Sequence, residues 1–303
     1  MGQLKGKVAI VTGSGGGIGR AVAQAYAREG AVVVINGRTA ANVEETVDLI
    51  KSANGEAIGV VGDVAEQGVA ERVVNAAVDK WGAVDVLVNN AAIGGPVAPL
   101  GKEDVTEWWK TQEINILGPF LMTRAAAAVM RRKSHTAGVA PRGKVIDVSS
   151  GAGRGWAGDL LPYRVSKAGL LRLSNGIATQ LQPEGIDVNT VDVFATTPMV
   201  IAFGKADDQD PALAARMRKR VLSQEPTPAD NTPVFVWLAS SRSDGVTGRN
   251  FGWNMNVEDL DRVKLKLIAD TRALRIEMVP MEGIGLSPEA RAHQDRIVAM
   301  AKK

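Results

Sequence analysis

The chain has no cysteine among its 303 residues and only two histidines, His135 and His293. Without cysteine there is no disulfide framework, no thiol nucleophile and no thiolate metal site. The two histidines stand in unrelated sequence contexts, so we expect no histidine-based metal site either. Aromatic residues are scarce, at 4%, and include just two tyrosines. A tyrosine within a chemical motif is therefore informative here.

Long apolar runs and blocks of one charge are also missing. No apolar run reaches the ~18 residues of a membrane span, and the first residues lead directly into an apolar strand without room for a cleavable signal. We therefore expect a cytoplasmic protein with no membrane partner. The 36 basic and 33 acidic residues are spread along the chain and give a formal charge of +3. This balance predicts no nucleic-acid surface.

Hydrophobic residues, at 45%, are sufficient for a core, and the length fits one α/β domain with an appendage. We expect a domain over residues 1–255 and a helical C-terminal extension over 256–303. Short apolar runs alternate with helical patterns, which predicts a doubly wound parallel sheet flanked by helices. The expected strands are 8–11, 31–36, 57–61, 84–88, 144–148, 186–191 and 245–253. The expected helices include 18–28, 41–51, 65–81, two within 102–132, one from about 163, and 232–239.

A glycine-rich loop, TGSGGGIG, lies between the first expected strand and the first expected helix. Such a loop lets the backbone approach a pyrophosphate, and the helix N-terminus adds free N–H groups and a partial positive charge. The strand–loop–helix setting favours a dinucleotide cradle over an ordinary tight turn. The residues predicted to contact the cofactor here are Gly13, Ser14, Gly17, Ile18 and Gly19.

The second expected strand ends in Gly37 and Arg38. An acidic residue at this strand end commonly accepts the ribose 2′-hydroxyl of NAD, whereas a nearby arginine suits the 2′-phosphate of NADP. Arg38 therefore favours NADP(H). The alternative is that Arg38 only caps a solvated turn and the protein uses NAD(H).

Tyr163 and Lys167 stand four residues apart after a Ser-Ser pair that ends an apolar strand. On a helix they share one face, and the ammonium group is expected to lower the pKa of the phenol from about 10 towards the range of a general acid or base. Ser150 could supply a hydroxyl that orients the substrate oxygen. Alone, this spacing is usually a chance pair on a solvated helix, but its place downstream of a glycine-rich loop favours catalysis.

Together these motifs resemble the short-chain dehydrogenase/reductase superfamily from about residue 7 to residue 253. The matching text is TGSGGGIG, NNAA, Asn115, Ser150 and YRVSK, in the family's order. The resemblance implies a Rossmann-type fold and an NAD(P)-dependent oxidoreductase. It implies that Tyr163 donates or accepts a proton, while Lys167 lowers the pKa of the tyrosine and holds the nicotinamide ribose. It further implies that Ser150 fixes the carbonyl and that Asn115 supports a water-linked proton relay.

The resemblance also assigns residues at two further strand ends. Asp63 would contact the adenine amino group and Val64 would pack on the ring, although an Asp after a strand is as often a helix N-cap. Asn90 and Ala91 either lie along the cofactor or only support the central sheet. Each of these four positions therefore keeps a structural alternative.

After the strand over 186–191 the chain departs from the family pattern. Val193 and Phe194 stand where Pro-Gly is usual, in a turn that normally fixes the nicotinamide carboxamide. Either Thr196 or Thr197 is expected to take the place of the usual threonine. Residues 199–220, rich in alanine, methionine and charge, are expected to form a mobile lid over the substrate.

The function predicted from these observations is hydride transfer between NADP(H) and a secondary alcohol or ketone, in a homodimer or homotetramer. The polar link over 131–144 is similar to a branch near the 3-oxoacyl-carrier-protein reductases and the hydroxyacyl-CoA dehydrogenase part of the peroxisomal multifunctional enzyme. A large apolar substrate, such as a 3-oxoacyl thioester or an alicyclic ketone, is suggested by residues that could equally be ordinary packing. They are Trp156, Leu160, Phe194, Met199 and Phe203.

Two other functions stay open at this point. One is an NAD-dependent alcohol dehydrogenase of the same family, and the other is a non-catalytic dinucleotide-binding scaffold. The complete set of serine, tyrosine, lysine and asparagine argues against a scaffold. The altered turn at Val193 and Phe194 is the one feature in its favour.

The C-terminal extension carries apolar residues at steps of three and four, which predicts a helix with one buried stripe. A second helix is expected to begin after Ser287 and Pro288, a cap followed by proline at the first helical position. We expect the stripe to pack at a subunit interface and to shape a pocket entrance. The alternative is a loosely attached tail. The stripe consists of Val257, Leu260, Val263, Leu267 and Leu274.

Overall fold

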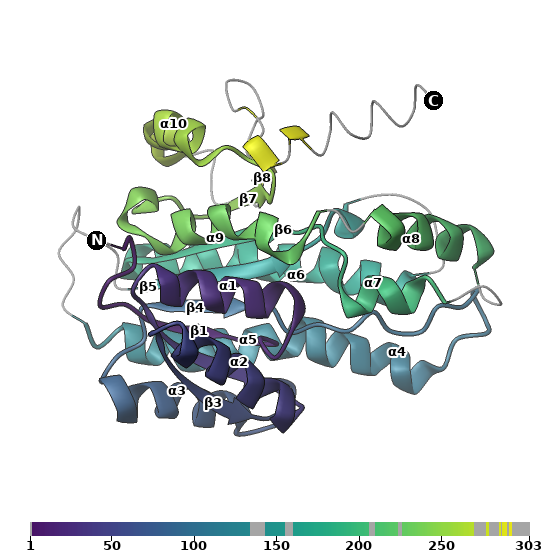
Figure 1. Cartoon of the computed structure of the whole chain (residues 1–303), viewed down its shortest axis with the longest axis horizontal. Helices are drawn as coiled ribbons and strands as arrows, with labels where there is room; N and C mark the ends of the chain where they lie inside the picture. Colours follow the sequence, from purple (N-terminus) through teal and green to yellow (C-terminus); the bar gives the residue numbers. More distant parts are fainter. Residues whose placement is uncertain are drawn as a thin grey trace.

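The computed structural model of the protein describes residues 2–133, 143–154, 160–205, 210–223 and 226–269, together with 277–278, 285, 287–289 and 291–292. Its centre is a parallel sheet with helices on both faces (Figure 1). The strands lie in the order β3-β2-β1-β4-β5-β6-β7-β8, which confirms the predicted doubly wound fold and adds a short eighth strand that was not predicted. The strands are β1 (Val8–Val11), β2 (Val32–Gly37), β3 (Glu56–Val61), β4 (Val86–Asn89), β5 (Gly143–Ser149), β6 (Ile186–Asp192), β7 (Arg249–Gly252) and β8 (Glu277–Met278).

The helices follow the sequence pattern, with ends set by local backbone geometry. A π-helical turn, Glu113–Leu117, joins α4 to α5 in one continuous helical stretch. Helix α3 begins later than residue 65 because Gly68, at its N-cap, is left-handed with φ of 81°. The helices are α1 (Gly17–Arg28), α2 (Ala40–Ser52), α3 (Val69–Trp81), α4 (Val105–Gln112), α5 (Gly118–Met130), α6 (Leu161–Leu181), α7 (Pro198–Phe203), α8 (Pro211–Ser223), α9 (Thr232–Ala239) and α10 (Val257–Ala269). None of these described helices combines the length and apolar character that a membrane crossing needs.

Two apolar layers, one on each face of the sheet, hold the helices in place. On one face α1 and α9 bury Tyr26 and Trp237, and the Trp237 ring packs on Phe251 of β7 at 5.8 Å. On the other face α3, α5 and α6 bury side chains such as Val73 and Met122. Because helices cover both faces of the sheet, β1 and β4 are buried at every residue, and only Asn89 among these residues is polar.

The strand order reverses between β1 and β4, which neighbour each other in the middle of the sheet. In open α/β sheets, ligands bind beyond the carboxyl ends of the strands at this kind of switch point. The chain segments that leave β1, β2, β4, β5 and β6 all start at that edge. They carry the glycine-rich loop, Arg38, Asn90, Ser150 and Val193 respectively.

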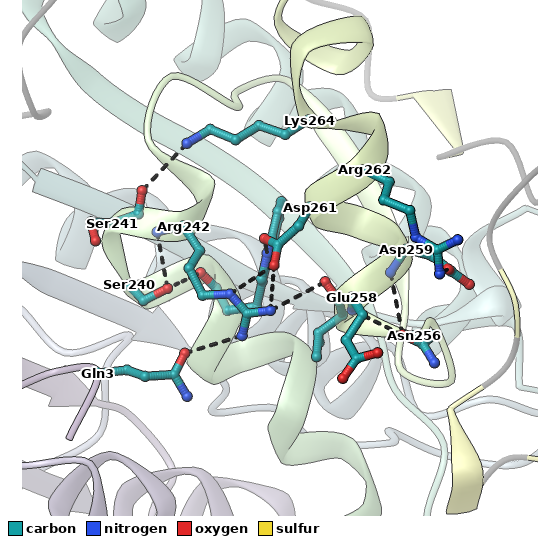
Figure 2. A network of polar contacts seen from close by, with 12 residues as sticks. Gln3, Ser240, Ser241, Arg242, Asn256, Glu258, Asp259, Asp261, Arg262 and Lys264 are labelled. Atoms are coloured by element: carbon teal, nitrogen blue, oxygen red, sulfur yellow. Dashed lines mark hydrogen bonds and ion pairs between the residues drawn. The ribbon is translucent and has the colours of Figure 1, made fainter. Parts of the chain in front are cut away.

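Helix α10 of the C-terminal extension is docked on its own chain (Figure 2). Leu260 and Leu267 are buried in the core layer that contains α9. The Asp261 carboxylate accepts hydrogen bonds from Trp237 Nε1 at 2.7 Å and from Arg242 Nε at 3.1 Å. The chain itself therefore covers these two members of the stripe. The expectation that the extension packs at a subunit interface stays a prediction.

The described residues cover only part of what was predicted for the rest of the extension. Leu274, the last member of the stripe, lies outside the described residues. Residues 288–289 and 291–292 are helical, and the Arg291 N–H donates to the Ser287 carbonyl at 2.8 Å. The rest of the second expected helix lies outside the described residues.

Candidate active site

A cavity of about 700 Å³ opens at the carboxyl edge of the sheet. It brings together residues that are far apart in the sequence. The predicted residues that line it are Gly13, Gly17, Ile18, Arg38, Asn90, Ala91, Ser150, Tyr163, Lys167 and Thr197. The predicted residues that are not part of this lining are Ser14, Gly19, Asp63, Val64, Asn115 and Thr196. No residue of α10 lines the cavity, so the extension does not shape its described wall.

The glycine-rich loop is pressed against the end of β4. Gly13 has φ of 62°, and a Cβ there would lie 2.7 Å from the Ala91 Cα atom. A Cβ at Gly19 would lie 2.4 Å from Asn90 Nδ2, which donates hydrogen bonds to the carbonyls of Thr12 and Gly13 at 2.9 and 3.1 Å. Any larger residue at these two glycines would push the loop off the strand end. Packing therefore requires glycine at both positions, and at Gly13 the left-handed backbone requires it as well.

Ser14 and Thr12 shape the loop from behind the cavity. The Ser14 hydroxyl donates to the Val11 carbonyl at 2.6 Å and accepts from the Asn36 N–H at 3.2 Å. The Thr12 hydroxyl accepts from the N–H groups of Asn90 and Ala91 at 3.0 and 3.1 Å. These bonds join the ends of β1, β2 and β4, so both residues position the loop and do not face the cavity.

At the end of β2, the Arg38 side chain is half exposed and lines the cavity. Its Nη1 atom lies 3.7 Å from Asp63 Oδ2, while Asp63 Oδ1 accepts from the Ala65 N–H at 3.0 Å. Asp63 thus orders the turn after β3, and it does not cap α3, whose N-cap is Gly68. An ion pair this exposed contributes little stability, so Arg38 is available to a ligand. Thr39 and Asn42, which the sequence analysis did not single out, line the cavity beside Arg38.

Tyr163, Ser150 and Lys167 lie close together in the wall of the cavity. Tyr163 is half-buried, and its ring lies edge-on to Phe203 of α7 at 6.4 Å. Lys167 is buried, its Nζ atom lies 5.6 Å from the centre of the Tyr163 ring, and it donates to the Val148 carbonyl of β5 at 2.8 Å. Ser150 caps the short 3-10 turn Gly151–Gly153 by accepting from the Ala152 N–H at 3.2 Å. The hydroxyl, phenol and ammonium groups of the motif therefore share one region of the cavity.

The pKa of Tyr163 is raised, not lowered as predicted. Burial raises it to about 12, and the Asp192 carboxylate adds to this rise, while the Ser150 hydroxyl opposes it. Burial also lowers the pKa of Lys167 to about 8, against the pull of the Asp147 and Asp192 carboxylates. The prediction considered the ammonium group alone. In the structure its charge is offset by two buried carboxylates, so the cost of burying a phenolate decides the direction.

Asp147 and Asp192 were not identified from the sequence. Asp147 lies inside β5 and Asp192 is the last residue of β6. Asp147 of β5 is buried and accepts hydrogen bonds from Asn89 Nδ2 at 2.7 Å and from the Ser174 hydroxyl. Asp192 of β6 accepts from Arg154. A carboxylate inside a buried parallel strand is costly unless it is paired, and this is the signal that could have revealed them.

Asn115 lies in the π-helical turn and is fully buried. Its Nδ2 atom donates to the Ile93 carbonyl and to the Ser166 hydroxyl, both at 2.9 Å, and its Oδ1 atom accepts from the Ile93 N–H at 2.9 Å. Ser166 in turn donates to the Tyr163 carbonyl at 2.7 Å. Asn115 therefore ties the loop after β4 to the first turn of α6, from which Tyr163 projects. π-Helical turns often occur at functional sites.

The altered turn after β6 is held by one buried side chain. The Phe194 N–H donates to Asn231 Oδ1 and Asn231 Nδ2 donates to the Phe194 carbonyl, each at 3.1 Å. Of the two threonines, Thr197 lines the cavity and caps α7, whereas the Thr196 hydroxyl is buried. Thr197 is thus the threonine placed to meet a ligand.

The apolar part of the wall lies beside Tyr163. Phe203, Leu213 and Met217 form a small buried cluster, against which Leu160 and Met199 pack. Leu160, Phe194, Met199 and Phe203 all line the cavity, as the apolar substrate prediction requires, and Trp156 lies outside the described residues. Within the part of the chain that the structure describes, no group of three or more His, Cys, Asp or Glu side chains is arranged to hold a metal.

Known proteins resemble the chain in sequence and in structure. A family model described as short chain dehydrogenase matches residues 7–207. A Thermotoga maritima protein described as an uncharacterized oxidoreductase is 36% identical over 220 residues, which cover 72% of this chain and 84% of that protein. A Beutenbergia cavernae protein solved with bound NADP at low occupancy is 30% identical, with a TM-score of 0.71 over 83% of this chain and 96% of that one.

A second solved structure, an NAD⁺-bound xylitol dehydrogenase, is 26% identical, with a TM-score of 0.72 over 82% of this chain and 98% of that one. The two solved proteins hold different cofactors. The choice between NADP and NAD therefore depends on side chains of this chain, above all at the end of β2.

Proposed function

We propose that this chain, which belongs to the short-chain dehydrogenase family, uses NADP(H) to interconvert a largely apolar ketone and its secondary alcohol. The coarser activity follows from the family: the chain is an NAD(P)-dependent oxidoreductase that acts on alcohol and ketone groups. One observation carries the finer proposal. Tyr163, Lys167 and Ser150 line the same cavity as the glycine-rich loop, so a proton donor and a dinucleotide cradle face one space.

The residues present fit a dinucleotide. The loop glycines have no side chain at a place where a Cβ would meet the end of β4. The first residues of α1, Gly17 and Ile18, line the same cavity, and a helix N-terminus has free N–H groups that favour an anion. In the proposed complex this loop holds the pyrophosphate, Arg38 the 2′-phosphate and Lys167 the nicotinamide ribose. When bound, the nicotinamide ring supplies or accepts the hydride.

The proton chemistry of the site suits reduction at neutral pH. Because the pKa of Tyr163 is about 12, the phenol is protonated and can give its proton to a carbonyl oxygen. Lys167, with a pKa of about 8, is mostly cationic near pH 7 and would stabilise the phenolate that remains. Ser150 is placed to orient the carbonyl. The proposed roles are thus proton donor for Tyr163, electrostatic stabiliser for Lys167 and orienting hydroxyl for Ser150.

The proposed role of Asn115 is adjusted by its contacts. Its amide is engaged by Ile93 and Ser166, so we place it as a positioning residue behind Tyr163. The Asn115 amide would therefore not take part in a water-linked proton relay directly. Its role would be to order the loop after β4 and the first turn of α6, along which such a relay would run. Asp63 and Val64 are proposed to order the adenine end in the same indirect way.

The preference for NADP(H) is tested by Arg38→Asp. The substitution removes the cation proposed to bind the 2′-phosphate and adds a second carboxylate beside Asp63, 3.7 Å from the present guanidinium. We expect the Kd for NADPH to rise roughly tenfold or more, as is typical for the loss of a charged hydrogen bond, while the Kd for NADH falls or stays constant. Fluorescence titration with each reduced cofactor measures both values.

Arg28→Ala is the matched control, because Arg28 is an exposed cation of α1 that does not line the cavity. Equal NADPH affinity in the wild type and in Arg38→Asp would make Arg38 a bystander. NAD(H) would then be the expected cofactor, because Asp63 offsets part of the positive charge that Arg38 could offer to a 2′-phosphate.

We also propose a homodimer or homotetramer. Large apolar side chains are exposed along the continuous stretch of α4, the π-helical turn and α5, and on the neighbouring α6. Exposed apolar side chains gathered on neighbouring helices are a feature of interaction sites. The exposed residues are Val105, Trp109, Leu117, Phe120, Leu161 and Val165.

A further inference from the structure

The cavity has two ends with different chemistry. The glycine-rich loop and Arg38 lie at one end, at the edges of β1 and β2. At the other end Phe203, Leu213 and Met217 form an apolar cluster, and Phe203 contacts the Tyr163 ring edge-on at 6.4 Å. The dinucleotide proposed above takes the first end. The second end, next to the proton donor, is left for the substrate.

Two arginines line the cavity at this second end. Arg164 of α6 follows Tyr163 directly, and its N–H donates to the carbonyl of Leu160, which packs on the apolar cluster. Arg216 of α8 precedes Met217 of that cluster and also lines the cavity. Arg164 is half-buried and Arg216 is exposed, so both cations belong to the rim of the cavity beside the apolar cluster.

Neither guanidinium has a protein partner among the described residues. Other arginines of this chain are engaged: Arg154 donates to Asp192, and Arg218, also on α8, donates to the Gly204 carbonyl at 3.1 Å. No side-chain hydrogen bond or ion pair joins Arg164 or Arg216 to the described part of the chain. An arginine at a cavity wall without an acidic neighbour is suited to bind an anion from solution.

The described wall carries no acidic side chain. Its cations are Arg38, Arg164, Lys167 and Arg216. Arg38 lies beside Asp63 at the adenine end, and Lys167 is bound to the Val148 carbonyl under the tyrosine. Arg164 and Arg216 are the cations left over once the proposed cofactor contacts are assigned. A purely apolar substrate would leave them without a function.

We infer that the substrate carries an anionic group, a carboxylate or a phosphate, which Arg164 and Arg216 bind while its apolar part lies on Phe203, Leu213 and Met217. This inference rests on the proposed function and narrows it. The substrate is then an amphipathic oxo acid or its hydroxy counterpart, not a neutral ketone. The anion would then lie near α7 and α8, away from the glycine-rich loop.

The test compares matched ketones with NADPH as the reductant. The probes are 4-oxo-4-phenylbutanoate, its methyl ester and (3-oxo-3-phenylpropyl)phosphonate. We expect kcat/KM for at least one of the two anions to exceed that of the neutral ester by roughly 10- to 100-fold, and Arg164→Ala and Arg216→Ala each to remove most of this ratio. Preference between carboxylate and phosphonate identifies the anion.

Two controls separate charge at the wall from charge elsewhere. Arg172→Ala on α6 and Lys219→Ala on α8 remove exposed cations of the same helices that do not line the cavity, so the ratio of acid to ester should stay at the wild-type value. A melting curve of each variant checks that the fold is unchanged. An equal kcat/KM for acid and ester in the wild type would overturn the inference. It would also be overturned if the two arginine variants weakened NADPH binding and left the ratio unchanged.

A binding experiment keeps this inference separate from the proposed function. Calorimetry with 4-phenylbutanoate, which has no carbonyl to reduce, measures anion binding to the protein saturated with NADPH. Binding that weakens in Arg164→Ala and Arg216→Ala supports the anion site even if none of the ketones is reduced. Identical affinity for 4-phenylbutanoate and for neutral 4-phenylbutanamide would contradict it.

Discussion

Tyr163→Phe is expected to lower kcat for ketone reduction by roughly 10²- to 10⁴-fold, the usual cost of removing a general acid, with the Kd for NADPH unchanged. Phenylalanine keeps the ring that contacts Phe203 at 6.4 Å and lies 5.6 Å from Lys167 Nζ, so only the transferable proton is lost. The pKa of the Tyr163 phenol is about 12 in the protein, so the phenol is protonated at neutral pH. Single-turnover oxidation of NADPH measures the loss.

Tyr26→Phe is the control, because Tyr26 is the second tyrosine of the chain and its hydroxyl donates to the Phe235 carbonyl at 3.0 Å in the core. It should lower stability and leave kcat at the wild-type level. A Tyr163→Phe enzyme with wild-type turnover would remove Tyr163 from the mechanism.

Gly13→Ala is expected to destabilise the protein by about 2–5 kcal/mol. The sum combines roughly 1–2 kcal/mol for a left-handed alanine at φ of 62° with roughly 1–3 kcal/mol for the contact of its Cβ with Ala91 Cα at 2.7 Å. Because this contact also pushes the loop off β4, we expect the affinity for NADPH to fall at least tenfold. Urea unfolding and cofactor titration measure the two effects.

Gly6→Ala isolates the conformational part of that cost. Gly6 is also left-handed, with φ of 77°, but a Cβ there would meet no atom within 4 Å. It should therefore lose only about 1–2 kcal/mol and bind NADPH with wild-type affinity. Equal losses of stability in Gly13→Ala and Gly6→Ala would show that the loop does not depend on its contact with β4.

The sequence was sufficient for elements whose signals are local. The glycine-rich loop between an apolar strand and a helix, and the four-residue spacing of Tyr163 and Lys167, each depend on a few neighbouring residues. Their placement in one cavity follows from the parallel strand order, which the alternation of strands and helices also predicts. The sequence could not show which of Thr196 and Thr197 faces the cavity. Adjacent residues point in different directions, so only the three-dimensional structure distinguishes the two.

The direction of the Tyr163 pKa could not be predicted because its causes are distant in sequence. Asp147 and Asp192 come near Lys167 only because β5 pairs with β6, with Ser149 opposite Asp192. The stripe on α10 predicted that this helix is buried but not what covers it. Its partner is set by the contact of Asp261 with Trp237, 24 residues earlier. Burial and tertiary pairing decide such features, and neither can be read from a short window.

The most direct test of the central claim is a fluorescence titration of NADPH with the wild-type protein. We expect saturable binding at one site per chain, with a lower Kd for NADPH than for NADH, because the glycine-rich loop and Arg38 face the same cavity. Binding should also protect the protein against thermal unfolding, as any ligand specific for the folded state does. No saturable change with either cofactor would contradict the claim that this cavity is a dinucleotide site in front of Tyr163.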